Sequence, residues 1–115
     1  MAVAIGAFGA HGLRGRLDDY SMNIYERAVF YHFIHALGIL IVASIAEAGV
    51  LPRPTGAWVC RLLAAGVVLF SGSLYALALT GNRILGAITP FGGISFIAAW
   101  VVLAIGVARS RPSGI

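Results

Sequence analysis

The stretch AVFYHFIHALGILIVASIAEAGV at residues 28–50 is the strongest indication of how this chain folds. It is almost wholly apolar, and two further apolar stretches follow at residues 57–80 and 84–108. The hydrocarbon core of a bilayer is about 30 Å thick, so a helix that rises about 1.5 Å per residue crosses it in about 20 residues. Each of these stretches is long enough to cross a bilayer as a helix.

The composition of the whole chain agrees with a membrane protein. Of its 115 residues, 60% are hydrophobic and 10% are charged, and the mean hydropathy is +0.95. Soluble domains carry about 25% charged residues, so a soluble helical bundle of this composition would lack polar surface. We therefore expect an all-α integral membrane bundle that forms a single domain over residues 1–115.

The region before the first long stretch predicts two shorter elements. Residues 1–12 favour a short helix of about 18 Å, which is too short to cross a bilayer and gives a bundle of four helices with a short or truncated first one. Residues 13–27 are strongly polar, but apolar residues recur in them at helical spacing from Leu13 to Ile24. This pattern predicts a short interfacial amphipathic helix, with Asp18 or Asp19 as a cap within it.

Proline and glycine mark the breaks between the long stretches. Pro52 and Pro54 end the first stretch. The sequence Gly-Asn-Arg at residues 81–83 predicts a tight turn after the second stretch. Thr89-Pro90 and Gly92-Gly93 lie inside the third stretch, where they predict a kink or freed backbone bonds.

The basic residues lie at the ends of these segments. All 8 are arginines, and no basic run is interleaved with aromatic residues, so they indicate headgroup anchors and no nucleic-acid partner. Arginine without lysine, in an Ala- and Gly-rich chain, is typical of a GC-rich bacterial genome, and a multi-pass protein of the bacterial inner (plasma) membrane is expected. The positive-inside rule gives no orientation, because the arginines divide evenly between one side (Arg14, Arg16, Arg27, Arg83) and the other (Arg53, Arg61, Arg109, Arg111).

Most other polar groups are predicted in the half of the bundle that holds residues 13–27 and 81–83, and three histidines are among them. His11 ends the first short helix, while His32 and His35 share a face of the second. Imidazole ligates transition metals, so one interpretation is a metal site of His11, His32 and His35, a haem held by His11 with His32 or His35, or a proton relay. The other interpretation is hydrogen bonding between helices by neutral histidines, which we favour. No cofactor is assigned from the residues.

Other features favour packing over catalysis. Glu47 is expected to pair with Arg61 or Arg53, and lines of small residues at Ala2, Gly6 and Ala10 and at Gly72, Ala76 and Thr80 favour close packing with a neighbouring helix or a second copy. The sequence contains no phosphate-binding GxxxxGK[ST], HExxH or CxxC motif. No catalytic residue is nominated, and an enzyme is the less favoured class.

Several blocks resemble a known family. GAFGAHGL at residues 6–13, YHFIHAL at 31–37, FSGSLY at 70–75 and GAITPFGG at 86–93 occur in this order. Together they resemble the domain of unknown function 423 family, small membrane proteins that include transmembrane protein 256 of animals. The resemblance covers essentially the whole chain and implies a four-helix membrane protein without an established activity. Family members usually have more apolar residues before the first block, so we expect that this sequence starts too late or that the chain is truncated.

Three functions are compatible with these features. The leading hypothesis is a structural or accessory membrane protein that acts through helix packing, in a homo-oligomer or a larger membrane complex within the lipid bilayer. The alternatives are a haem- or metal-binding membrane protein that uses the histidines and, less favoured, a minimal transporter or proton pathway.

Overall fold

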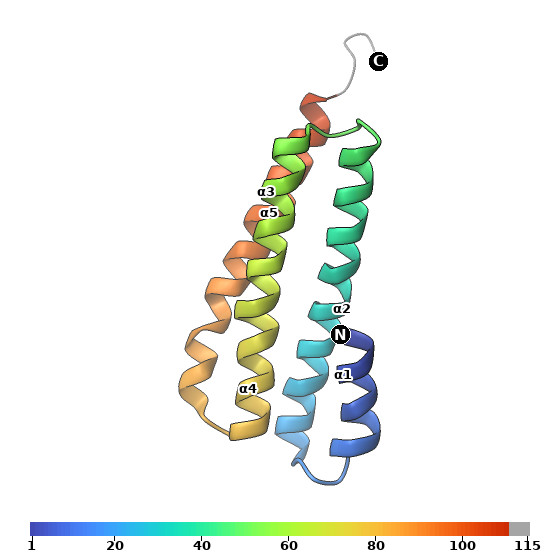
Figure 1. Ribbon diagram of the computed structural model, residues 1–115. Coiled ribbons are helices and arrows are strands. Elements are labelled where there is room, and N and C mark those ends of the chain that lie inside the picture. The colour runs from blue at the N-terminus through green and yellow to red at the C-terminus, as the bar shows by residue number, and fades with distance from the viewer. Residues whose placement is uncertain (111–115) are drawn as a thin grey trace.

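The computed structural model describes residues 1–110 and shows a bundle of antiparallel helices (Figure 1). A π-helical turn interrupts the helical segment Arg53–Thr80, and a short 3₁₀ helix begins the segment Arg83–Arg109. In chain order the elements are α1 (Ala2–Phe8), a π-helical turn (Gly9–Leu13), α2 (Asp19–Glu47), α3 (Arg53–Gly66), a π-helical turn (Val67–Ser71), α4 (Gly72–Thr80), the 3₁₀ helix (Arg83–Ala87) and α5 (Thr89–Arg109).

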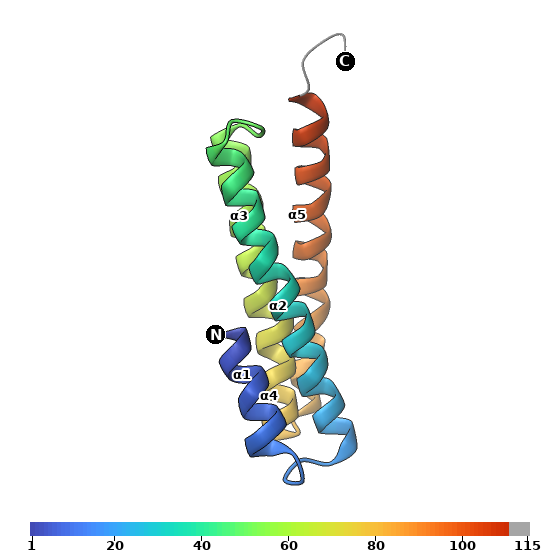
Figure 2. The same ribbon diagram turned by 90° about the vertical axis from the view of Figure 1, so that its right-hand side faces the viewer.

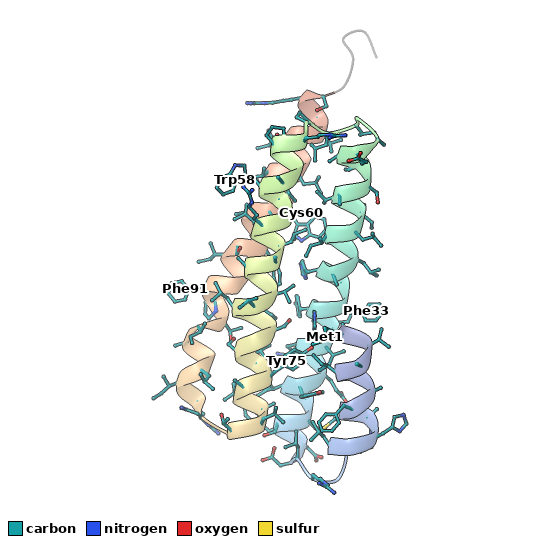
Figure 3. All side chains as sticks on the ribbon, in the orientation of Figure 1. Met1, Phe33, Trp58, Cys60, Tyr75 and Phe91 are labelled. Carbon is teal, nitrogen blue, oxygen red and sulfur yellow. The ribbon has the colours of Figure 1, made fainter. Side chains whose placement is uncertain are left out.

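The predicted membrane bundle is confirmed. The helical segments Asp19–Glu47, Arg53–Thr80 and Arg83–Arg109 are long and apolar enough to cross a membrane, and Ala2–Leu13 is a shorter apolar helix. Large apolar side chains point outward from them: Leu40 is 63% exposed and Val68 70%. In Figure 3, Trp58 and Phe91 also point away from the bundle. This surface suits hydrocarbon as its solvent.

The bundle has two ends, which we name by what they hold. The hairpin end holds the loop before α2 and the turn between α4 and the 3₁₀ helix, while the C-terminal end holds the loop between α2 and α3 and the end of α5 (Figure 1). The helix α1 starts midway along α2, with Met1 beside Phe33 and Leu37, because a helix this short spans only half of α2 (Figures 2 and 3).

The prediction of a separate amphipathic helix at residues 13–27 is wrong. The backbone leaves the helical conformation at Arg14, and Gly15 takes a φ of 88°, a left-handed conformation that ends the helical path. The second half of the segment forms the first turns of α2 instead. Asp18 caps α2 as one of the two predicted candidates, and its side chain accepts a hydrogen bond of 2.7 Å from the Ser21 N–H.

The predicted break in the last stretch occurs just before the proline. The 3₁₀ helix ends at Ala87 and α5 begins at Thr89, so Pro90 lies in the first turn of α5, where a missing N–H costs no hydrogen bond. The predicted tight turn is confirmed by Gly81, whose φ is 71°.

The core lies between α2, α3 and α5, with smaller clusters toward the hairpin end. Three glycines let helices approach closely: a side chain on Gly66 would collide with the Phe96 ring, one on Gly92 with the Phe70 backbone, and one on Gly56 with Ala46. The predicted lines of small residues are only partly used inside the chain. Ala2 is buried, but Ala10 is exposed, and a Cβ on Gly72 would meet no side chain, only the Val67 carbonyl oxygen at 4.0 Å.

Candidate functional site

His35 lies at the centre of an aromatic cluster formed by α2, the second π-helical turn and α5. Its ring stacks on Phe96, with centroids 3.6 Å apart, and its side chain is 5% exposed. The lining residues Tyr31, His35, Phe70, Gly93, Phe96, Ile97 and Trp100 enclose a groove of about 360 Å³. We call these residues the aromatic groove; it is the candidate site of this protein because it combines rings with an ionisable group.

The hydrogen bonds of His35 fix its tautomer. Its Nδ1 lies 2.7 Å from the Tyr31 carbonyl oxygen, which only accepts, so Nδ1 carries the proton. The Trp100 indole N–H donates to Nε2 over 3.1 Å, so Nε2 is unprotonated. His35 is therefore a neutral ring with both nitrogens used, one within α2 and one across to α5.

His32 joins a different pair of helices. Its Nδ1 is 3.0 Å from the Tyr75 hydroxyl of α4, and Figure 3 shows Tyr75 on the side of α4 that faces α2. The Tyr75 ring lies 5.3 Å from that of Tyr25, whose hydroxyl donates to the Ile5 carbonyl of α1 over 2.7 Å. A chain of polar and aromatic contacts thus links α4, α2 and α1.

Serine hydroxyls make further bonds between helices, which the sequence alone does not predict. Ser71 is fully buried in the second π-helical turn and donates to the Ala28 carbonyl of α2 over 2.9 Å. Ser95 of α5 donates to the Leu62 carbonyl of α3 over 2.7 Å. The only sequence signal for such bonds is a serine inside an apolar span, which must bond to its own or a neighbouring helix.

The three candidate metal ligands are not gathered at one place. His11 is exposed on the first π-helical turn, while His32 and His35 bond to α4 and α5. Residues 1–110 contain no group of three or more His, Cys, Asp or Glu side chains placed to hold a metal ion. Binding of a metal or haem by His11, His32 or His35 stays a prediction.

Charged groups remain at the ends of the bundle. Glu47 pairs with Arg53, one of its two expected partners, with Oε1 and Nη2 3.0 Å apart. Arg14 lies 3.7 Å from Glu26 at the hairpin end. The pKa of the Asp18 carboxyl lies below its ordinary value, because the backbone N–H and then the hydroxyl of Ser21 hydrogen-bond to it. These groups pair with one another or cap a helix at the ends of the bundle.

The arrangement favours packing over chemistry. Every buried side-chain nitrogen or oxygen within residues 1–110 has a hydrogen-bond partner. The serine hydroxyls of the bundle described above donate to backbone carbonyls, and no acid–base pair activates them as nucleophiles.

Comparison with known proteins agrees with this fold. The family described as "Protein of unknown function (DUF423)" has a sequence model that matches residues 5–93. The chain is 45% identical over 111 residues to the UPF0382 membrane protein YwdK of Bacillus subtilis, which covers 95% of this chain and 88% of the relative. A UPF0382 membrane protein of Staphylococcus haemolyticus is 52% identical over 105 residues, or 91% of this chain and 84% of the relative. One from Staphylococcus epidermidis is 50% identical over 109 residues, or 95% and 87%. No solved structure matches the chain.

Proposed function

We propose that this chain is a multi-pass accessory protein of a bacterial inner membrane. It belongs to the DUF423 family, and its relatives are named membrane proteins. In this role it binds other membrane helices, in a homo-oligomer or a larger complex, and catalyses no reaction of its own. Three long apolar segments support the multi-pass arrangement.

The observation that carries the accessory role is how the polar side chains are used. Two histidines and two serines of the long helices bond to neighbouring helices, as His35 does to Trp100 and Ser71 to Ala28. Such bonds hold helices in fixed positions and leave the polar atoms of these side chains occupied. The outer surface of the molecule is apolar, and small residues on it let another helix approach closely.

The line of Gly72, Ala76 and Thr80 on α4 is the surface best suited to a partner helix. Gly72 and Ala76 are half-buried and Thr80 is exposed, and a Cβ on Gly72 would meet only the Val67 carbonyl oxygen, at 4.0 Å. Small side chains let a second helix approach closely, which is how helices associate in lipid, where the hydrophobic effect does not drive association.

The test is the size of the particle in lipid. The tagged full chain, expressed at low level and extracted into lipid nanodiscs by a detergent-free polymer, is expected to run as an assembly with itself or with a defined partner. Gly72→Leu should release that assembly while the monomer stays folded, and Ala104→Leu, at an exposed small residue of α5, is the matched control. A particle that is strictly monomeric and without a partner would contradict the proposal.

A further inference from the structure

A second groove lies at the C-terminal end of the bundle, apart from the aromatic groove. It has a volume of about 350 Å³ and runs between the start of α3 and the last turns of α5. Its lining includes Thr55 from α3 and Val102, Ile105 and Arg109 from α5. Gly106 also lines it, where α5 lies directly against Leu51 and Thr55 of the neighbouring segments.

The α5 wall of this groove changes from apolar to basic along the helix axis. Val102, Ile105 and Arg109 follow one another at helical spacing and share one face. At about 1.5 Å per residue, Val102 lies roughly 10 Å deeper in the membrane than Arg109. A phospholipid has the same order of groups, with its phosphate at the surface and its acyl chains below.

The charges around the groove favour an anion. Arg53 at this end is paired with Glu47, and Arg61 lies over the Trp58 ring, 5.3 Å from its centroid. Within residues 1–110, no acidic side chain lies within ion-pair distance of Arg109. No hydrogen bond from the Thr55 hydroxyl occurs in that range either, so a guanidinium and a hydroxyl are both available at the groove.

We propose that this groove is a binding site for one anionic phospholipid, with the phosphate on Arg109 and Thr55 and an acyl chain along Ile105 and Val102. Arginine suits this role because its planar fork of N–H groups matches phosphate oxygens, and basic pockets between membrane helices recognise anionic headgroups. The site goes beyond the accessory role and does not depend on it, because a monomer can bind a lipid here.

A plainer role for Arg109 is to compensate the negative end of the α5 dipole. That role requires the charge but neither the groove nor the Thr55 hydroxyl. Substitutions that change the groove and keep the charge therefore separate the two roles.

The experiment is native mass spectrometry of the full chain in mild detergent. The protein is titrated with phosphatidylglycerol or with phosphatidylcholine of the same acyl chains. We expect one phosphatidylglycerol to bind several-fold more tightly than phosphatidylcholine. Arg109→Gln should lower that preference about fivefold, the contribution of one arginine near an anionic membrane surface. Arg83→Gln at the hairpin end is the matched control and should leave the preference unchanged.

Two variants that leave the charge of the protein unchanged test the proposal if Arg109→Gln fails to fold. Thr55→Val removes the hydroxyl at constant shape and should weaken phosphatidylglycerol binding. Ile105→Trp fills the acyl-chain part of the groove, where Ile105 is 48% exposed and a larger side chain has room. Both should lower binding while Arg109 is present, and a dipole role alone would leave it unchanged.

Three results would overturn the proposal. The first is equal affinity for the two lipids, and the second is an equal loss of preference in Arg109→Gln and Arg83→Gln. The third is competition by glycerol 3-phosphate at the concentrations at which phosphatidylglycerol binds, because a site that needs no acyl chain is a free-phosphate site.

Discussion

At the scale of single residues, the neutral His35 explains how an ionisable side chain lies inside this bundle. The Tyr31 carbonyl accepts from Nδ1–H and the Trp100 indole donates to Nε2, so the ring needs no solvent. Protonation of Nε2 would direct two N–H groups at each other. Since a charge in the membrane interior is costly, the geometry favours one protonation state.

The bond between His35 and Trp100 should couple α2 to α5. His35→Phe keeps a flat ring on Phe96 but leaves the indole N–H without its acceptor, and Trp100→Phe removes the donor. We expect a coupling free energy of about 1 kcal/mol between the two changes, because interhelical hydrogen bonds in membrane proteins are of that size. Reversible unfolding in mixed micelles, analysed as a double-mutant cycle, measures it. Strictly additive effects would show that this bond does not hold the helices together.

The cap of α2 should respond to pH. The pKa of Asp18 is lowered in the folded chain, so its carboxylate stabilises the helix start above the ordinary value of 3.8, and this stabilisation is lost as the pH falls through the lower folded pKa. The Ser21 amide resonance, followed by NMR in micelles, should therefore titrate with a midpoint below 3.8. Asp18→Asn should keep the cap and abolish the titration. A midpoint at or above 3.8 would contradict the assigned contact.

The sequence predicts that His32 and His35 bond between helices, but it does not predict their partners. The favoured interpretation of His32 and His35 as bonds between helices follows from a general rule, since a buried imidazole in lipid needs partners. The partners themselves could not be predicted. Trp100 is 65 residues from His35 along the chain, and the register that brings the two together depends on how α2 and α5 pack.

At the scale of elements, the π-helical turn Val67–Ser71 shapes the centre of the bundle. The extra residue in this turn alters the direction of the side chains that follow. Phe70 of the turn lies 4.6 Å from Tyr31 and 5.6 Å from Phe96, ring to ring, and Ser71 bonds to α2. Gly92 permits this arrangement, because α5 passes directly over the Phe70 backbone.

Two neighbouring glycines on α5 should therefore differ in their tolerance of a methyl group. A Cβ on Gly92 would lie 2.7 Å from the Phe70 Cβ and 2.8 Å from its Cα, whereas one on Gly93 meets only Phe70 Cδ2 at 4.0 Å. We expect Gly92→Ala to lower the free energy of unfolding by about 3 kcal/mol or more, through overpacking against backbone. Gly93→Ala should change it by about 1 kcal/mol or less. Unfolding in mixed micelles compares them, and equal effects would contradict the close crossing of α5 and the π-helical turn.

The sequence predicts the long helices well and the polar segment poorly. Hydropathy marks each long span because the bilayer imposes a fixed length. In residues 13–27 the apolar spacing is helical on both sides of Gly15, yet the left-handed backbone at that glycine divides the segment. Periodicity alone does not detect such a break, and the π-helical turn at Val67–Ser71 leaves no mark in an apolar run either.

At the scale of the whole molecule, the apolar outer surface and the polar groups at both ends suit a position in a bilayer. The three long segments alternate in direction, so the loop before α2 and the turn after α4 lie at one end (Figures 1 and 2). The loop after α2 and the end of α5 lie at the other. The short α1 packs on α2 from the hairpin end to about its middle.

Substituted-cysteine labelling tests the spanning arrangement most directly. In a chain carrying Cys60→Ala, single cysteines at exposed positions, Asp19→Cys, Thr80→Cys, Ala48→Cys and Ser110→Cys, are treated with a membrane-impermeant maleimide in intact spheroplasts and in inverted vesicles. We expect the first two to react from one face of the membrane and the last two only from the other. Reaction of Asp19→Cys and Ala48→Cys from the same face would contradict it, because α2 would then not cross the bilayer.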